Sequence, residues 1–353
     1  MIAAILLGCA PPLPASRLVT VDPARSLVAA HGVLVTAFYP AGDGFALIVG
    51  GDGRIAWSRA APSGLRVARV TDGGGGTVVL GLNDPGDERL DGTVYRETLD
   101  GDVVSDTVVP SFHHDLVPLD GGRFAALGHT AEQRIVDGHG SLEVGSDVIR
   151  LADEGGGSTV AFDFLHDYGV DPFWTCPHMT RGEHVPGVNE WTHTNSLVRA
   201  DDGGWLVMPR YLDAIVKLDP SFRVEWQLGG RDGDLDTDGA VLFAHAHFSD
   251  AWDDRILVFD NGWDHDGPPA AKVVELAVDA VAHTAREVWS YAEPEGRYVS
   301  YLGDAKRLSN GNTLIAWGNL DRIDEVTPEG DVVWQVALDR TVGRAELWTH
   351  AVP

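Results

Sequence analysis

Basic residues are scarce in this chain, and the shortage bears on which partners it can have. Lys and Arg together number 26 against 53 Asp and Glu, which gives a formal net charge of -27 over 353 residues. Nucleic-acid phosphates require a basic face, and anionic membrane surfaces attract polybasic segments. The composition therefore predicts no nucleic-acid partner and no adsorption to an anionic membrane. Any anionic ligand has to be attracted by a few local positive groups.

Cysteine is also scarce, with only Cys9 and Cys176 present, so no disulfide framework is expected. Cys9 follows a short apolar run in the sequence LLGCA, which resembles the lipidation site of bacterial lipoproteins. On this interpretation residues 1–8 are a signal peptide, residues 9–20 are a tether, and a lipid on Cys9 anchors the protein at the bacterial cell envelope, periplasmic or at the surface. The alternatives are a fragment of an ordinary signal peptide or a chance match.

Long apolar runs and nucleotide-binding loops are missing as well. No other segment reaches the about 20 apolar residues of a membrane-spanning helix, and no GxxxxGK[ST] phosphate loop occurs. The sequence therefore predicts no spanning helix, no nucleotide-type donor and no cofactor. Residues 232–239 (DGDLDTDG) are similar to a calcium-binding loop, but the twelfth position is His245 where the pattern requires Glu. A solvated acidic turn is the preferred interpretation.

Glycine, in contrast, is abundant at 42 residues, above the roughly 7% of average proteins. Frequent Asp-Gly and Gly-Gly pairs predict tight turns and an all-β chain. One element recurs: a turn that usually contains glycine, two β-forming residues, then an aromatic residue or its replacement. Its spacing of about 45 to 65 residues fits units of four strands. The six copies are residues 52–57, 100–105, 157–162, 221–226, 285–289 and 329–334.

A hairpin pattern follows every copy of this element except the last. Six related units favour a six-bladed β-propeller, formed by residues 21–353 as one domain, over a pair of β-sandwiches. The C-terminal stretch 345–350 is predicted to close the ring beside an N-terminal strand. The hairpin patterns are residues 65–80, 114–127, 195–208, 247–259 and 303–317.

Polar residues capable of chemistry occupy equivalent places in these hairpins. When the hairpins are aligned at their turns, His114, Asn195 and His247 fall at the same position. The first strand of each propeller blade lines the central channel, so these side chains are predicted to meet at one mouth of the channel, together with His193. Arg210 follows the second strand of the Asn195 unit and is predicted to lie at the same end.

The chemistry of this set favours transfer of an anionic group. Histidine acts as a nucleophile or general base near neutral pH, arginine holds a tetrahedral anion with a fork of donors, and the Asn195 amide can donate to a developing oxyanion. Together they predict sulfuryl or phosphoryl transfer through an N-linked histidine intermediate. A metal site is the alternative, because 113–115 and 245–247 supply zinc-type ligands. Arg210 and Asn195 are unsuitable neighbours for a cation.

A long insertion, residues 165–190, lies just before the strand that follows His193. Loops of this length often cover functional sites, so the insertion is a candidate lid. It contains Cys176, which is interpreted as a packed thiol rather than a nucleophile.

These motifs together resemble the bacterial arylsulfate sulfotransferases. The resemblance covers roughly residues 113–334. It implies a six-bladed periplasmic propeller that moves a sulfuryl group from a phenolic sulfate to a phenolic acceptor without a nucleotide donor. The motifs that carry it are 191–196 (WTHTNS), Arg210 with 216–219 (VKLD), 226–230 (WQLGG), 243–247 (FAHAH), 259–262 (FDNG) and 308–315 (LSNGNTLI).

The resemblance also implies roles for individual residues. In the family, the histidine before the strand that ends in FDNG becomes sulfurylated, and His247 matches it. The His-x-Asn pair corresponds to His193 and Asn195, and the anion-holding arginine to Arg210. The family's earlier histidine corresponds to His114, an acid–base group together with His193, with His113 as the alternative. Apart from the resemblance, His113 and His245 are candidate substrate contacts, and His245 is an unusual neighbour for the family's catalytic histidine.

The sequence departs from the family pattern at Ala246, where the family pairs a glutamine with the catalytic histidine. The cysteine pair and the separate N-terminal β-domain of the enterobacterial enzymes are not evident. Two other functions therefore remain beside sulfuryl transfer. One is a non-catalytic propeller lipoprotein that binds a ligand or partner, and the other is a metal-dependent propeller hydrolase.

Overall fold

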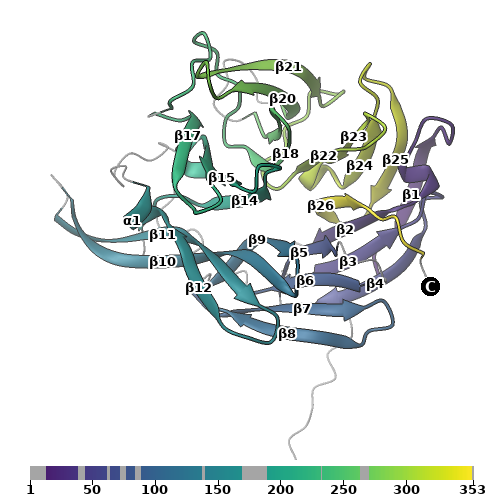
Figure 1. Cartoon of the computed structure of the whole chain (residues 1–353). Helices are drawn as coiled ribbons and strands as arrows, with labels where there is room; N and C mark the ends of the chain where they lie inside the picture. The colour runs from purple at the N-terminus through teal and green to yellow at the C-terminus, as the bar shows by residue number, and fades with distance from the viewer. Residues whose placement is uncertain are drawn as a thin grey trace, which may run out of the picture.

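Six β-sheets arranged around a central axis make up the described part of the chain (Figure 1). The computed structural model describes residues 13–38, 44–61, 64–71, 77–83, 89–136, 140–168, 189–231, 233–262 and 270–351. The arrangement confirms the predicted all-β fold and the six-bladed propeller. Cys9, Cys176 and most of the 165–190 insertion lie outside the described residues, so the predicted lipid anchor and lid stay predictions.

Four sheets are each built mainly from one stretch of chain, whose first strand lies nearest the axis. The first contains β5 (Leu65–Val70), β6 (Thr77–Leu82), β7 (Gly92–Thr98) and β8 (Val103–Val109). The next contains β9 (Phe112–Leu119), β10 (Arg123–Val136), β11 (Gly140–Asp153) and β12 (Ser158–Asp163), followed by α1 (Phe164–Asp167), with β13 (Asn189–Glu190) parallel to β11. The third contains β14 (Thr194–Arg199), β15 (Trp205–Pro209), η2 (Arg210–Leu212), β16 (Ala214–Leu218) and β17 (Val224–Gly229). The fourth contains β18 (His247–Trp252), β19 (Arg255–Asp260), β20 (Lys272–Asp279) and β21 (Thr284–Ala292).

The other two sheets join the two ends of the chain. The C-terminal strand β26 pairs antiparallel with β2, and the N-terminal strand β1 pairs antiparallel with β25. The first of these sheets contains β26 (Thr341–Leu347), β2 (Val33–Phe38), β3 (Gly44–Val49) and β4 (Ile55–Ala61). The second contains β22 (Asp304–Arg307), β23 (Thr313–Ala316), β24 (Arg322–Val326), β25 (Val332–Leu338) and β1 (Ser16–Val21). Two 3-10 helices, η1 (Val28–Ala30) and η3 (Gly318–Leu320), lie in loops of this region.

This closure explains one prediction and corrects another. The last repeat has no hairpin after it because its two inner strands, β26 and β2, come from opposite ends of the chain. The predicted closing strand exists, although it spans Thr341–Leu347 rather than 345–350. Ser16–Val21 form a strand, so the C-terminal part of the predicted tether, residues 9–20, belongs to the propeller.

The recurring sequence element forms the fourth strand of each sheet and the turn before it. In three copies its tryptophan connects one sheet to the next, because the indole Nε1 donates to a carbonyl in the neighbour's third turn. Such a donor satisfies a polar atom on a large apolar side chain. The three bonds run from Trp57 to Leu99 (2.7 Å), from Trp289 to Pro328 (2.8 Å) and from Trp334 to Gly51 (2.9 Å). The aromatic position of the repeat is therefore a contact between blades.

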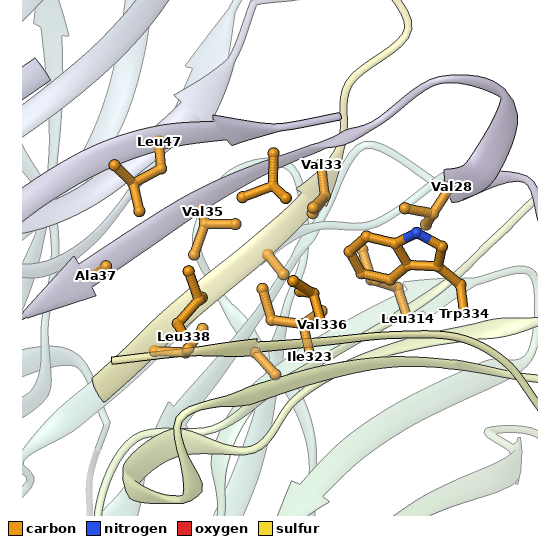
Figure 2. Packing of buried hydrophobic residues seen from close by; sticks show 14 of the residues in the cluster. Val28, Val33, Val35, Ala37, Leu47, Leu314, Ile323, Trp334, Val336 and Leu338 are labelled. Carbon is orange, nitrogen blue, oxygen red and sulfur yellow. The ribbon is translucent and has the colours of Figure 1, made fainter. Parts of the chain in front are cut away.

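Apolar side chains fill the spaces between adjacent sheets. Figure 2 shows the cluster at the closure, where Val33 and Val35 of β2 face Ile323, Val336 and Leu338 of the last sheet. Trp334 lies fully buried in the same cluster (Figure 2). Burial of this kind, repeated between every pair of neighbouring sheets, supplies the main favourable free energy of the ring.

No helix among the described residues is long and apolar enough to cross a membrane.

We expect Trp334 to contribute strongly to stability because it seals the junction between the last and first sheets. Trp334→Ala should cost about 3–5 kcal/mol of unfolding free energy through the cavity it creates. Trp334→Phe keeps most of the volume but leaves the Gly51 carbonyl without its donor, and should cost about 1–3 kcal/mol. Denaturant unfolding measures both, with Trp289→Phe as the matched control, since its bond is exposed. Equal losses for the two phenylalanine variants would contradict this account.

Candidate active site

Three of the predicted histidines hold an unusual backbone conformation where the chain enters the inner strands. His114, His193 and His245 have φ values of 49°, 48° and 48°, in the left-handed region. Non-glycine residues in this region cost of order 1–3 kcal/mol each and persist where the surrounding structure imposes them, often at functional sites. The strain therefore marks the starts of β9, β14 and β18 as candidates for function.

Side chains from the β9 and β14 sheets meet through these histidines. The rings of His114 and His193 are edge to face, with centroids 4.9 Å apart. His113 Nδ1 lies 2.9 Å from His114 Nδ1. His113 is fully buried and His114 is half-buried. Both members of the doubled histidine thus belong to the cluster, rather than one of them facing away.

Arg210 is held beside His193 by the 3-10 helix η2. The Arg210 amide donates to the His193 carbonyl (3.2 Å) and the Tyr211 amide donates to the Thr192 carbonyl (3.0 Å). The Tyr211 ring stacks on His193 with centroids 4.7 Å apart, and the Arg210 guanidinium lies 5.9 Å from the Tyr211 ring centre. The backbone therefore places the predicted arginine and histidine together.

The Arg210 guanidinium is half-buried, and none of the described carboxylates forms an ion pair with it. Its Nε is buried and has no hydrogen-bond partner among the described residues. Leaving such donors unsatisfied costs free energy that a bound anion recovers. In a chain with a net charge of -27, an unpaired cation at this position is a candidate anion-binding group.

His247 begins β18 and its ring orientation is set by Asn261. His247 Nδ1 lies 2.6 Å from Asn261 Oδ1. The Asn261 Nδ2 donates to the carbonyls of Val299 (2.9 Å) and Leu302 (3.0 Å), so the amide can face His247 only with its oxygen. An oxygen acceptor requires a proton on Nδ1. Neutral His247 therefore carries its lone pair on Nε2.

Asn195 connects the β14 sheet to the segment that carries His247. Its Nδ2 donates to the Ala246 carbonyl at 3.1 Å. Its Oδ1 is buried and has no hydrogen-bond partner among the described residues. The contact gives Asn195 a positioning role for residues 246–247, beside the oxyanion-donor role that the sequence predicts.

His245 pairs with the end of η2. Its backbone amide donates to Asp213 Oδ1 (2.6 Å), and its Nε2 lies 3.9 Å from Asp213 Oδ2. Asp213 itself holds φ 49° as the left-handed cap of η2. These contacts tie the 243–247 segment to the helix that carries Arg210, and they give His245 a structural role in addition to the substrate contact that the sequence predicts.

A buried ionic cluster lies next to the histidines along β9. The Asp115 carboxylate contacts Arg69 Nη2 (2.6 Å) and Arg344 Nη2 (3.0 Å), and it accepts from the Leu197 amide (2.9 Å). Burial lowers the pKa of Arg344, and the neighbouring Arg69 lowers it further. Because removing one member of such a cluster leaves an uncompensated charge, these residues fix β9 against β5, β14 and β26.

The acidic turn at 232–239 shows ordinary turn bonding where it is described. Asp234 Oδ2 accepts from the Gln227 amide and Asp236 Oδ1 from the Asp238 amide, each at 2.9 Å. These three aspartates are exposed, and Asp232 lies outside the described residues. Across the described ranges, no group of three or more His, Cys, Asp or Glu side chains is arranged to hold a metal ion.

Sequence reasoning missed four residues of this site: Asp147, Glu190, Tyr211 and Asn261. Asn261 stands inside the FDNG motif, so the motif itself could have suggested it. Asp147 interrupts the apolar run of β11, and a buried acid in such a run is a usable signal. Glu190 Oε2 lies 3.5 Å from His193 Nδ1. It stands in the insertion, where no pattern marks it, and Tyr211 has no sequence signal either.

The fold and the site define a class: a six-bladed propeller with histidines and an arginine gathered where the inner strands of adjacent blades begin. The family model described as arylsulfotransferase (ASST) matches residues 92–337, which is more than half of the chain. The chain belongs to this family, and the resemblance inferred from the sequence is confirmed. No curated protein sequence matches the chain.

Solved structures share the fold at low sequence identity. A protein of unknown function from Bacteroides caccae is 14% identical, with a TM-score of 0.50 and coverage of 89% of this chain and 97% of that one. Virginiamycin B lyase from Staphylococcus aureus is 8% identical, with a TM-score of 0.47 and coverage of 91% and 88%. The periplasmic gluconolactonase of Pseudomonas aeruginosa is 14% identical, with a TM-score of 0.46 and coverage of 92% and 99%. At 14% identity the likeness to the Bacteroides caccae protein concerns the fold alone.

Proposed function

We propose that this protein transfers a sulfuryl group from a phenolic sulfate ester to a phenolic acceptor, with His247 as the nucleophile. In the first half-reaction His247 Nε2 attacks sulfur, an N–S bond forms, and the S–O bond to the donor breaks. The donor phenolate leaves and takes up a proton. In the second half-reaction the acceptor phenol loses a proton and attacks the same sulfur, the N–S bond breaks, and the electron pair returns to Nε2.

The observation that carries this proposal is the contact between His247 and Asn261. The two carbonyl acceptors of Asn261 Nδ2 direct its oxygen at His247 Nδ1. This fixes the tautomer in which Nε2 holds the lone pair, as a nitrogen nucleophile requires. The same bond to Nδ1 stabilises the charge that develops on the ring when Nε2 forms its bond to sulfur.

Arg210 is the group best suited to hold the sulfuryl oxygens. Its guanidinium is half-buried and unpaired within the described part of the chain, and it stands beside His193. A planar fork of donors matches the oxygens of a tetrahedral anion. Donors that are already in place stabilise the transition state without having to reorganise during the reaction. Arg210 thus gives the site a receptor for an anion inside an acidic protein.

The replacement of the family's glutamine by Ala246 is compatible with this chemistry. Asn195 holds the segment through the Ala246 carbonyl, which every amino acid supplies. The alanine side chain is buried in the apolar cluster between the β14 and β18 sheets. The arrangement of His247 therefore does not depend on a side chain at position 246.

The test measures release of nitrophenolate from the donor 4-nitrophenyl sulfate with and without phenol as the acceptor. A parallel reaction contains a chelator. Release that requires phenol and persists with chelator supports sulfuryl transfer. Release that the chelator abolishes indicates the metal-dependent hydrolase instead. Saturable binding of the ester without turnover indicates the non-catalytic binder.

We expect Asn261→Ala to lower kcat by up to about 10⁴-fold, the size of loss known when a catalytic histidine is left in the wrong tautomer. The KM for the donor should change little, because Arg210 is untouched. Asn319→Ala is the matched control, since this half-buried asparagine accepts from the Ser300 amide in an exposed hydrogen bond. An unchanged kcat in folded Asn261→Ala would show that Asn261 does not orient His247.

A further inference from the structure

A buried carboxylate stands behind the doubled histidine. Asp147 of β11 is 3% exposed, and its Oδ1 lies 3.2 Å from His113 Nε2 and 3.6 Å from His129 Nδ1. Its Oδ2 accepts from the Thr192 hydroxyl (2.7 Å) and from the Thr194 amide. The carboxylate is therefore fixed in place by the segment that leads into β14.

Asp147 is ionised in this environment. Burial by itself raises the pKa of the Asp147 carboxyl, but the His113 and His129 imidazoles outweigh it and hold that pKa well below its usual range. A buried carboxylate costs free energy unless positive or hydrogen-bond donor groups compensate it. The site thus contains a buried carboxylate one imidazole away from His114.

The direction of the proton chain follows from these contacts. The Asp147 carboxylate, 3.2 Å from His113 Nε2, favours a proton on that nitrogen although the contact does not have hydrogen-bond geometry, and neutral His113 then accepts at Nδ1. The 2.9 Å approach of the two Nδ1 atoms then requires a proton on His114 Nδ1. Neutral His114 consequently has its lone pair on Nε2. Its ring is half-buried and lies against His193.

We propose that Asp147 and His113 are positioning residues of a proton relay that ends at His114, the group that exchanges protons with the phenols. This inference rests on the proposed sulfuryl transfer. Protonated His114 gives its Nε2 proton to the donor phenolate as the S–O bond breaks. Neutral His114 then takes the proton of the acceptor phenol as the acceptor oxygen bonds to sulfur and the N–S bond breaks. One proton leaves the relay and one returns in each turnover.

The charged groups around His113 and His114 favour proton exchange at His114. The groups near the two imidazoles are Asp147 and His129 on one side, and His193 with Glu190 on the other. Asp147, through His113, stabilises the positive charge that His114 carries when it is protonated, as the acid of a catalytic triad does for its histidine. His193 is fixed between Tyr211 and Glu190, next to the anion-holding Arg210.

The relay predicts a dependence on the leaving group that a structural role does not. 4-Nitrophenolate is stable enough to leave without a proton, whereas phenolate needs one. Asp147→Asn should therefore slow sulfuryl loading of His247 from phenyl sulfate by about 10²-fold or more, the size of a general-acid contribution. Loading from 4-nitrophenyl sulfate should change by less than about 3-fold. Asp153→Asn, the same substitution at an exposed position of β11, should leave both rates unchanged.

The outcomes separate the relay from the proposed function. Equal slowing with both donors, or slowing with neither, overturns the relay and leaves the sulfuryl transfer standing. Failure of the wild-type protein to load a sulfuryl group from either donor overturns the transfer and the relay together. His113→Gln is the second variant, because its amide can accept from His114 Nδ1 but supplies no imidazole through which Asp147 stabilises protonated His114. It should show the same selective loss with phenyl sulfate even if Asp147→Asn does not fold.

Discussion

Replacing His247 by alanine is expected to lower the kcat of sulfuryl transfer by at least about 10⁴-fold, because the variant has no atom to accept the group. Loss of a catalytic nucleophile in a comparable two-step enzyme costs about 10⁶-fold. The residual rate then reflects the anion site alone. The assay is phenol-dependent release of nitrophenolate from 4-nitrophenyl sulfate.

The matched control for this variant is His31→Ala, which removes an exposed histidine just before β2, beside the end rather than the start of the inner strand β26. Its kcat and KM should equal those of the unmodified protein. His247 is buried and bonded to Asn261, so the thermal unfolding midpoint of each variant must be measured as well. Full activity in folded His247→Ala would contradict the assignment of the nucleophile.

The second large effect is expected from Arg210. Arg210→Ala should lower kcat/KM by about 10²- to 10³-fold, comparable with the loss of one preorganised oxyanion donor. Arg210→Lys keeps the charge but not the planar fork, so it should recover only part of this loss. Stability should change little, because the guanidinium makes no ion pair with the described residues.

Inhibition by inorganic sulfate gives an independent measure of the same role. Sulfate should compete with the donor in the unmodified protein and lose most of this effect in Arg210→Ala. Arg231→Ala is the control, since Arg231 is an exposed arginine shortly after the same sheet. Unchanged sulfate inhibition in Arg210→Ala would mean that another group holds the anion.

The repeat could be predicted from the sequence because its physical causes are local. A tight turn precedes the fourth strand of each of the six sheets, and β-forming residues follow it. The three tryptophans that donate to the next blade all stand at the aromatic position of this repeat. The equivalence of blades then implies that the inner strands share an axis. His114 and His193 lie in contact and Asn195 reaches the His247 segment, so the repeat register alone was enough to bring these residues together.

The partners of these histidines could not be predicted, because they stand on other strands or in loops that come together only in the folded structure. Asn261 presents its oxygen to His247 because its Nδ2 donates to two carbonyls of the 299–302 loop, and this loop leads into another sheet. Asp147 lies on the third strand of its sheet and meets His113 of the first. The N-terminal strand was missed because Ser16–Val21 pair with the far end of the chain, and nothing in their own sequence shows this.

The most direct test of the central claim is the mass of the peptide that contains His247 after incubation with 4-nitrophenyl sulfate and no acceptor. The account predicts a peptide heavier by one sulfuryl group, carried on the His247 side chain as an acid-labile N–S bond. Addition of phenol should discharge it and yield phenyl sulfate. A protein that turns over the donor while this peptide stays unmodified, or that carries the group on another residue, would contradict the account.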